Sequence, residues 1–179
     1  LGIALVTPFK LNGEIDYDAL EKLIEYQLEN GADFFTILAT TGECPCLSAE
    51  EKEKLTETII SIVSGRAPIL KYCGGNNTAA VVEEIKQTNW KGIDGILSIC
   101  PYYNKPSQEG LYQHFKAIAE TSSLPIVLYN VPGRTGVNMK AETTVRIAND
   151  FPNIVAIKEA AGSLEQVDEI IKNKPKHFE

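Results

Sequence analysis

The sequence predicts a parallel α/β fold, and three observations support this prediction. Short runs of β-branched and large apolar residues recur with almost no polar interruption, as in strands buried on both faces. Segments with helical spacing lie between these runs, so strands and helices alternate. The repeat is about 30 residues long, the length of one strand–helix unit. The six predicted strands cover residues 3–7, 34–39, 68–73, 95–100, 125–129 and 154–158.

The predicted helices have recognisable starts and stops. The segment 16–31 places apolar residues at helical spacing and reaches a glycine stop at Gly31. The segment 48–65 opens with Ser48 and Glu51, a capping box in which each side chain satisfies a backbone N–H of the other residue. Similar serine starts predict two further helices, from Ser107 and from Ser163.

Two architectures accommodate six such units, namely a doubly wound sheet and a (β/α)8 barrel. No G-x-G-x-x-G or Walker motif is present, and the absence of a nucleotide-binding fingerprint favours the barrel. A closed barrel needs eight strands and typically about 250 residues. We therefore predict one domain over residues 1–179, of the (β/α)8 TIM-barrel type but truncated after about six βα units.

Composition and charge exclude several classes of partner. Of the 179 residues, 44% are hydrophobic and 23% are charged, as in ordinary globular proteins. The net charge of -7 disfavours binding to nucleic acids and to anionic membranes. No apolar run approaches the roughly 20 residues of a membrane span. No signal peptide is recognisable either, so we expect a cytoplasmic protein.

Cysteine and histidine do not suggest a metal site or a classical triad of nucleophile and base. The four cysteines match no zinc pattern and are expected to be reduced thiols. Cys44 and Cys46 form a C-P-C pair, for which a redox role stays open. The two histidines, His114 and His177, are too few for a His-rich metal site or a Ser-His-Asp triad.

In parallel α/β folds, ligands bind at the carboxyl ends of the strands. Lys158 ends the last apolar run, and alternation along the strand points its side chain away from Glu159. Desolvation lowers the pKa of such a lysine, and a shift from about 10.4 to about 7.4 costs about 4 kcal/mol. A neutral amine can attack a carbonyl to give a Schiff base. The alternative is an ammonium that reaches water where the strand frays.

Three other strand-end candidates each have two interpretations. Lys71 competes with Lys158 as the nucleophile, but it lies earlier in its strand, and a side chain that snorkels to the surface fits it better. Tyr129 is either a proton shuttle or a core aromatic residue. Arg134 either offers a planar fork to a carboxylate or forms a surface ion pair.

Two loops add further candidates. Thr40 and Thr41 precede Gly42 at a strand-to-loop turn, where their hydroxyls either bind a small carboxylate or merely close the turn. Tyr102 and Tyr103 lie between two prolines, and such a stiff aromatic loop suits an interface as well as a site.

Taken together, these motifs resemble the dihydrodipicolinate synthase branch of the class I pyruvate aldolase superfamily, which includes N-acetylneuraminate lyase. The resemblance covers nearly the whole chain and is carried by "VTPF", "TTGE", "PYYNKPSQEGLYQHFKAIAE", "LPIVLYNVPGRTG" and "IVAIKEA". It implies a (β/α)8 barrel with a further C-terminal helical region. This chain corresponds to the N-terminal part, with strands one to six.

The resemblance implies a catalytic role for four residues. Lys158 would form the Schiff base with pyruvate, and Tyr129 would relay protons with Thr40 as its hydrogen-bonded partner. Tyr103 matches the tyrosine that reaches into the site of a neighbouring subunit, so the resemblance implies a homodimer or a homotetramer.

Two further residues would bind substrate. Thr41 would hold the pyruvate carboxylate, and Arg134 would receive L-aspartate 4-semialdehyde. The implied product is 4-hydroxy-tetrahydrodipicolinate, on the diaminopimelate route to lysine. The protonated imine is itself the electron sink, so no metal and no organic cofactor are implied. A sugar-acid aldolase of the N-acetylneuraminate lyase type and an inactive barrel fragment remain as alternatives.

Overall fold

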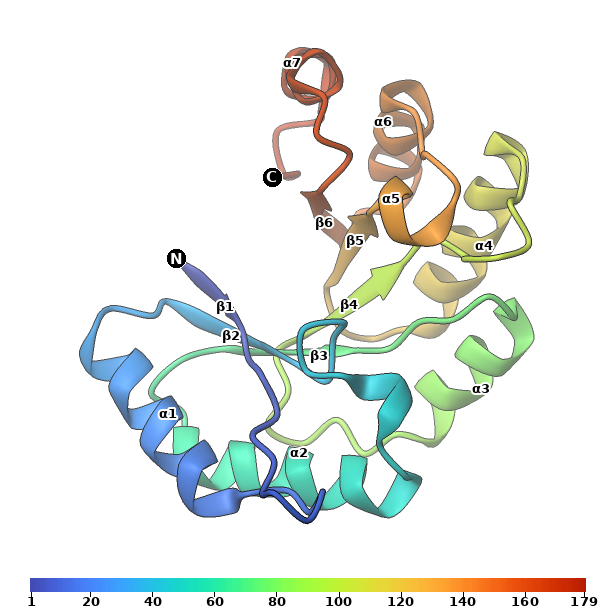
Figure 1. Ribbon diagram of the computed structural model, residues 1–179. Helices are drawn as coiled ribbons and strands as arrows, with labels where there is room; N and C mark the ends of the chain where they lie inside the picture. Colours follow the sequence, from blue (N-terminus) through green and yellow to red (C-terminus); the bar gives the residue numbers. More distant parts are fainter. The chain divides into compact units, whose positions relative to one another are not determined.

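The computed structural model describes all residues from 1 to 179, and the chain divides into two compact units (Figure 1). Unit 1 comprises residues 1–72 and 90–94, and unit 2 comprises residues 73–89 and 95–179. Strands and helices alternate along the chain, and the strands within each unit pair in parallel, which confirms the predicted α/β class. None of the helices combines the length and the apolar character that crossing a membrane requires.

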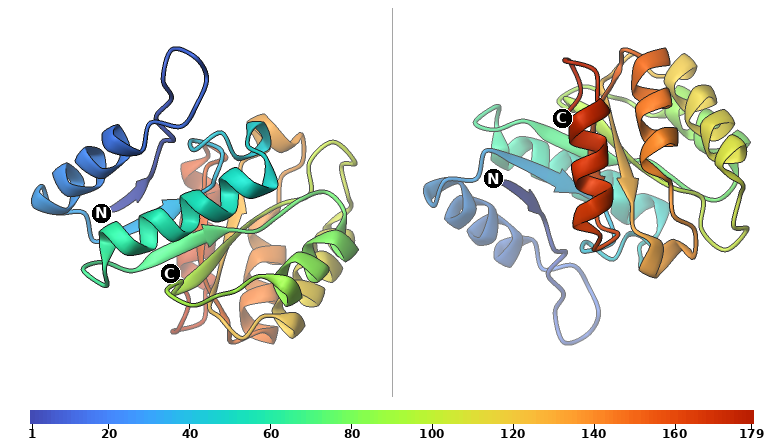
Figure 2. Two further views of the ribbon diagram at one scale, coloured as in Figure 1. Left: turned by 90° about the horizontal axis from the view of Figure 1, so that it is seen from below. Right: turned by 90° about the horizontal axis from the view of Figure 1, so that it is seen from above.

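Unit 1 contains three parallel strands, with β2 paired to both of the others. Its strands are β1 (Gly2–Ala4), β2 (Phe34–Ile37) and β3 (Ile69–Tyr72). The unit also holds two long helices and one 3-10 turn, which are α1 (Tyr17–Glu29), α2 (Ala49–Val63) and η1 (Cys44–Cys46). Helices α1 and α2 pack against each other, and the left view of Figure 2 shows them in blue and teal.

The helix ends of unit 1 confirm the predicted capping. The Ser48 hydroxyl accepts a hydrogen bond from the Glu51 N–H at 3.1 Å, and the Glu51 carboxylate accepts one from the Ser48 N–H at 2.8 Å. Helix α1 begins after Asp16, whose carboxylate accepts from the Ala19 N–H. Gly31 follows the last turn of α1 with φ at +85°, a conformation that glycine adopts without steric cost.

Unit 2 contains the other three parallel strands, with β5 paired to the strand on each side of it. Its strands are β4 (Gly95–Ile99), β5 (Ile126–Asn130) and β6 (Ile154–Glu159). Its helices are α3 (Thr78–Gln87), α4 (Gln108–Thr121), α5 (Pro132–Thr135), α6 (Ala141–Asp150) and α7 (Leu164–Asn173). Helices α3 and α4, α4 and α6, and α6 and α7 pack pairwise.

The chain after α7 returns to β6. The Glu179 N–H donates to the Val155 carbonyl at 2.9 Å, and the Glu179 carbonyl accepts from the Ile157 N–H at 2.8 Å. Glu179 thus bonds to Val155 and to Ile157, the two neighbours of Ala156. This is the hydrogen-bond pattern of a parallel ladder. Phe178, which precedes it, is completely buried.

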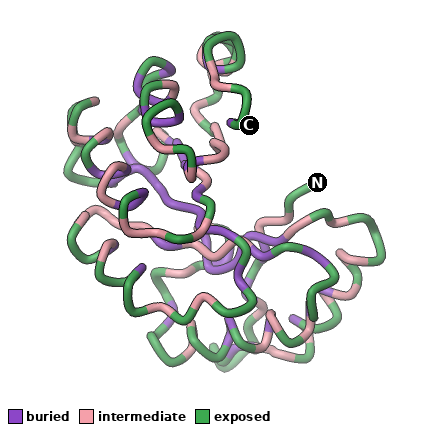
Figure 3. Tube along the Cα trace, turned by 180° about the vertical axis from the view of Figure 1, so that it is seen from behind, coloured by how far each residue is buried: buried purple, intermediate pink, exposed green.

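The core of each unit is made by its strands and by the inner faces of its helices (Figure 3). Strand β4 is buried over its whole length, as expected of a strand in a parallel sheet covered on both faces. The predicted extent of the first strand is wrong, since β1 ends at Ala4 rather than at Thr7. Thr7 lies outside the strand, and its side-chain hydroxyl donates to the carbonyl of Gly42 at 2.7 Å.

Candidate functional site

Lys158 and Tyr129 lie side by side at the carboxyl ends of β6 and β5. The parallel register pairs Tyr129 with Lys158 directly, so both side chains project from the same face of the sheet. The Lys158 Nζ lies 4.7 Å from the centroid of the Tyr129 ring. Tyr129 is buried, whereas Lys158 is half-buried and reaches the rim of the sheet.

The environment of Lys158 favours the neutral amine. Burial lowers the pKa of Lys158 below its ordinary value of 10.5, because the charged form loses hydration. Lys158 forms no ion pair with the adjacent Glu159, whose carboxylate accepts hydrogen bonds from Asn130, Gln166 and the Ala161 N–H instead. The sequence prediction that Lys158 and Glu159 face opposite sides of the strand is therefore confirmed. A half-buried amine without a counter-charge suits nucleophilic attack on a carbonyl.

Arg134 lies in the short helix α5, which follows β5 directly. Its side chain is exposed and forms no ion pair, in contrast to the surface-pair alternative. Thr135, the next residue, is buried, and its hydroxyl donates to the carbonyls of Val131 and Val137. The loop therefore anchors its backbone inside unit 2 while the guanidinium stays available to an anion from solvent.

The loop that bears Tyr103 is joined to the loop that bears Arg134. The Tyr103 N–H donates to the carbonyl of Thr135 at 3.2 Å. Tyr103 has a positive φ of 71°, which is uncommon for an aromatic residue, and its side chain is 87% exposed. Aromatic residues are enriched at protein interfaces, so this exposed ring suits an interface residue.

Thr40 and Thr41 lie in unit 1, in the turn between β2 and η1. Backbone hydrogen bonds close this turn, from the Gly42 N–H to Ala39 and from the Glu43 N–H to Thr40. Thr40 is half-buried and Thr41 is exposed, so neither hydroxyl is needed to close the turn by a side-chain bond. Both remain available to a ligand.

Lys71, the competing lysine, has a different setting. It lies on β3 in unit 1, and its Nζ lies 5.6 Å from the centroid of the Trp90 ring. Lys158 also lies over an aromatic ring, that of Tyr129, so the contact with an aromatic ring does not separate the two lysines. Lys158 is favoured as the nucleophile because burial lowers its pKa and because it pairs with Tyr129 across the strands.

Cysteine and histidine form no recognisable centre in the structure. None of the four cysteines forms a disulfide, and no group of three or more His, Cys, Asp or Glu side chains is arranged to hold a metal ion. His114 is buried and its Nδ1 shares a hydrogen bond with the Thr78 hydroxyl at 2.8 Å. Burial lowers the pKa of His114 to about 4, which indicates a neutral residue of the core.

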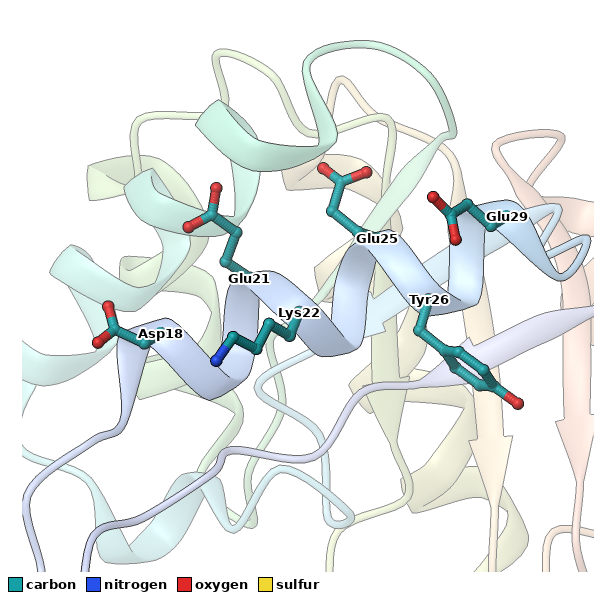
Figure 4. Close-up of a pocket in the computed structure, with 6 residues that line it drawn as sticks. All are labelled: Asp18, Glu21, Lys22, Glu25, Tyr26 and Glu29. Carbon is teal, nitrogen blue, oxygen red and sulfur yellow. The ribbon is translucent and has the colours of Figure 1, made fainter.

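A surface hollow of about 550 Å³ lies along α1, and no strand residue lines it. Its lining residues all come from this one helix, and Figure 4 shows their side chains projecting from it. They are Asp18, Glu21, Lys22, Glu25, Tyr26 and Glu29. A row of carboxylates on one exposed helix face is a solvated surface, so we assign it no chemistry.

Sequence reasoning missed Asn130 and the partners of Glu159. Asn130 is a completely buried polar residue at the end of β5, and its amide contacts Glu159, Asn138 and Met139. The sequence does contain a sign of this cluster, because Asn130 directly follows the apolar residues of β5. An amide at such a position is expected to be buried, and a buried amide requires hydrogen-bond partners.

Comparison with known proteins agrees with this geometry. The pattern of the dihydrodipicolinate synthetase family matches residues 1–179. The 4-hydroxy-tetrahydrodipicolinate synthase of Parabacteroides distasonis is 58% identical over 178 residues, which are 99% of this chain and 60% of that protein. The synthase of the same name from Phocaeicola vulgatus is 59% identical over 179 residues, 100% of this chain and 60% of that protein.

A solved structure is similar over the same range. The dihydrodipicolinate synthase of Bacillus anthracis matches with a TM-score of 0.93 at 45% identity, covering 99% of this chain and 60% of that one. This similarity confirms the predicted TIM-barrel class with six βα units, and the chain spans about 60% of the length of the curated relatives it matches. The chain therefore belongs to the dihydrodipicolinate synthetase family.

Proposed function

We propose that this chain carries the Schiff-base machinery of a synthase that condenses pyruvate with L-aspartate 4-semialdehyde to 4-hydroxy-tetrahydrodipicolinate. The observation that carries the proposal is the Lys158 amine, which lies 4.7 Å from the Tyr129 ring centroid with its pKa lowered by burial. The names of the relatives from P. distasonis and P. vulgatus support the same reaction.

In the first half of the proposed reaction, the neutral Lys158 amine attacks the keto carbon of pyruvate. The carbinolamine loses water to give a protonated imine, and loss of a methyl proton gives the enamine. Tyr129 lies beside the amine and relays the protons, with Thr40 as its partner. Thr41 holds the pyruvate carboxylate through its hydroxyl.

In the second half, the enamine carbon adds to the aldehyde of L-aspartate 4-semialdehyde. The exposed guanidinium of Arg134 receives the carboxylate of this substrate, because its planar fork matches a carboxylate in two hydrogen bonds. The amino group of the condensed product then closes the ring and releases Lys158. The protonated imine accepts the electrons when the methyl proton leaves, and the aldehyde oxygen accepts them, with a proton, when the new carbon–carbon bond forms. The proposed reaction therefore uses no metal and no organic cofactor.

We also propose that the working enzyme is a homodimer or a homotetramer. Tyr103 is 87% exposed on a loop with a positive φ, so its side chain is free to enter the site of a second copy. We propose the cytoplasm as the compartment, because cysteines without disulfides suit a reducing environment.

The proposal is tested by trapping the imine. The chain is incubated with pyruvate and borohydride, and the modified peptide is identified by mass spectrometry. We expect one pyruvyl adduct, on Lys158. An adduct on Lys71 would contradict the assignment of the nucleophile. A folded sample without any adduct would instead favour the inactive-fragment alternative.

Arg134→Ala separates the proposed synthase from a sugar-acid aldolase. We expect the variant to keep adduct formation on Lys158 and to lose turnover of L-aspartate 4-semialdehyde, because only the second substrate needs the guanidinium. Turnover is measured on the printed chain and on the same chain continued by the C-terminal part of the P. vulgatus relative. Turnover that survives the substitution would contradict the role of Arg134.

A further inference from the structure

A cluster of polar side chains lies on the face of β5 and β6 opposite to Tyr129 and Lys158. The register pairs Asn130 with Glu159, one residue beyond the Tyr129–Lys158 pair. Because side chains alternate along a strand, Asn130 and Glu159 share the other face of the sheet. Asn130 is completely buried, and none of the residues in this cluster touches substrate in the proposed reaction.

The Glu159 carboxylate is fully engaged as an acceptor. The Asn130 Nδ2 contacts both of its oxygens, at 3.1 Å and 3.0 Å. The Gln166 Nε2 donates to one oxygen at 2.8 Å, and the Ala161 N–H donates to the other at 2.7 Å. These bonds fix the backbone that directly follows Lys158, and they tie it to the start of α7, where Gln166 lies.

The Asn130 amide also closes the base of the loop that bears Arg134. Its Oδ1 accepts from the Met139 N–H at 3.0 Å, and its Nδ2 donates to the Asn138 Oδ1 at 2.7 Å. Asn130 precedes this loop and Met139 follows it, so one side chain joins both ends. We call this set the Asn130 clamp, consisting of Asn130, Asn138, Met139, Glu159 and Gln166.

The thiol of Cys100 completes the surroundings of the amide. Its Sγ lies 3.8 Å from the Asn130 Oδ1 and donates to it. Burial, together with the charge of Glu159, raises the pKa of Cys100 to about 12, so the thiol stays protonated and remains a donor. The Oδ1 thus receives only donors, whereas the Nδ2 faces only acceptors. An amide alone satisfies both sides, and neither a carboxylate nor an apolar side chain can replace it.

The backbone ladder holds Lys158 independently of the clamp. The Ala160 N–H donates to the Asn130 carbonyl at 2.8 Å, and the β5–β6 register does not involve side chains. The loop with Arg134 has no such ladder. The Asn130 side chain joins its two ends, while Gln108 bonds the Asn138 carbonyl and Gln166 bonds the Met139 carbonyl at its far end only. A change at the amide should therefore move Arg134 and leave Lys158 beside Tyr129.

We propose that Asn130 and Glu159 are positioning residues, which fix the position of the Arg134 loop relative to Lys158 on β6. Through this clamp they set the orientation in which L-aspartate 4-semialdehyde approaches the enamine. The inference rests on the proposed function, since it assumes that Arg134 receives the aldehyde and that Lys158 bears the enamine.

Asn130→Asp tests the clamp, because it keeps the shape of the side chain and places an oxygen against the Glu159 carboxylate. We expect the rate of pyruvyl adduct formation on Lys158 to stay within about threefold of that of the parent chain. The KM for L-aspartate 4-semialdehyde should rise by roughly 10- to 100-fold, as expected when a reacting group is displaced by about 1 Å. Amide hydrogen exchange should accelerate at Met139 and in the loop 131–138.

Rescue tests the direct contact between the two residues. Glu159→Gln alone should also raise the KM, because its amide group meets donors on every side. In the double variant with Asn130→Asp, the new amide at position 159 donates to the new carboxylate at position 130. We therefore expect the double variant to recover most of the affinity for L-aspartate 4-semialdehyde. A double variant worse than the sum of the two single variants would overturn the proposal.

Asn153→Asp is the matched control. Asn153 precedes β6, and its Nδ2 donates to the carbonyls of Ala119 and Ser122 at 2.8 Å and 3.3 Å. We expect this variant to lose stability without the split between adduct formation and KM. A similar split in both variants would overturn the clamp and indicate general destabilisation.

The outcomes also separate this proposal from the proposed function. If the parent chain forms no adduct on Lys158, the proposed function fails and the clamp fails with it. If the parent forms the adduct and Asn130→Asp leaves the KM for the aldehyde unchanged, only the clamp is overturned. Adduct formation and amide hydrogen exchange are measured on the 179-residue chain. The KM for L-aspartate 4-semialdehyde is measured on the chain extended by the C-terminal part of the P. vulgatus relative.

Discussion

The turn after β2 and the ends of β5 and β6 both present polar groups, but by different means. In unit 1, the turn at Thr40 is closed by backbone hydrogen bonds and by the Thr7 hydroxyl. The side chains of Thr40 and Thr41 are therefore not needed to hold the turn. In unit 2, Lys158 and Tyr129 depend on the register of two strands, and side chains on the opposite face fix the adjoining loop. A small hydroxyl is positioned by local turn geometry, whereas a half-buried amine requires long-range packing.

The largest effect expected from this contrast concerns the two lysines. Lys158→Met removes the amine and keeps an unbranched stem, so adduct formation should vanish and turnover should fall by about 1,000-fold or more. Lys71→Met, the matched control on β3, should keep adduct formation within about twofold, since Lys71 has no role in the proposed reaction and its nearest aromatic ring is that of Trp90. Mass mapping after borohydride trapping measures both. Loss of the adduct in both variants would remove the distinction between the lysines.

A smaller effect is expected for the hydroxyl beside the amine. Tyr129→Phe keeps the buried ring that contacts Lys158 and removes only the proton relay. We expect turnover to fall by about 100-fold, within the usual range for general acid–base catalysis, with little change in thermal stability. Steady-state kinetics and a melting curve measure the two quantities. Unchanged turnover would show that Tyr129 is a core aromatic residue and no more.

On the unit 1 side of the comparison, the expected effect is on stability. Thr7→Val is nearly isosteric and removes the buried bond from the Thr7 hydroxyl to the Gly42 carbonyl, so the free energy of unfolding should fall by about 1–3 kcal/mol. Thr7→Ser keeps the donor and should lose less. Urea unfolding measures both. Equal stability of the valine variant and the parent would show that the turn is held by its backbone alone.

The smallest expected effect is a displacement of a pH profile. Because burial lowers the pKa of Lys158, the neutral amine is present at a lower pH than in a free lysine, and the rate of adduct formation should rise with pH to a midpoint below 10.5. Trapping rates measured across the alkaline range give this midpoint. A midpoint at or above 10.5 would mean that the amine is as well hydrated as a surface lysine.

Several local features could be predicted from the sequence. The capping box of Ser48 and Glu51 forms as expected, and the opposite orientation of Lys158 and Glu159 follows from alternation along a strand. The helices α3 and α6 were not among the predicted helices. The N-cap residue of α6, Lys140, offers no side-chain cap, whereas α3 has one from Asn77. The end of β1 was also misplaced, because Thr7 leaves the ladder to bond Gly42.

The sequence by itself determined the alternation of strands and helices, their approximate limits and the candidate residues at the strand ends. These features depend on periodicity and on capping, which act over a few residues. Only the tertiary structure decided that Tyr129 pairs with Lys158 and that Asn130 joins Glu159 to Met139. Such contacts link segments up to 29 residues apart, and they depend on how two strands pair, which is decided only when both strands pack into the same sheet.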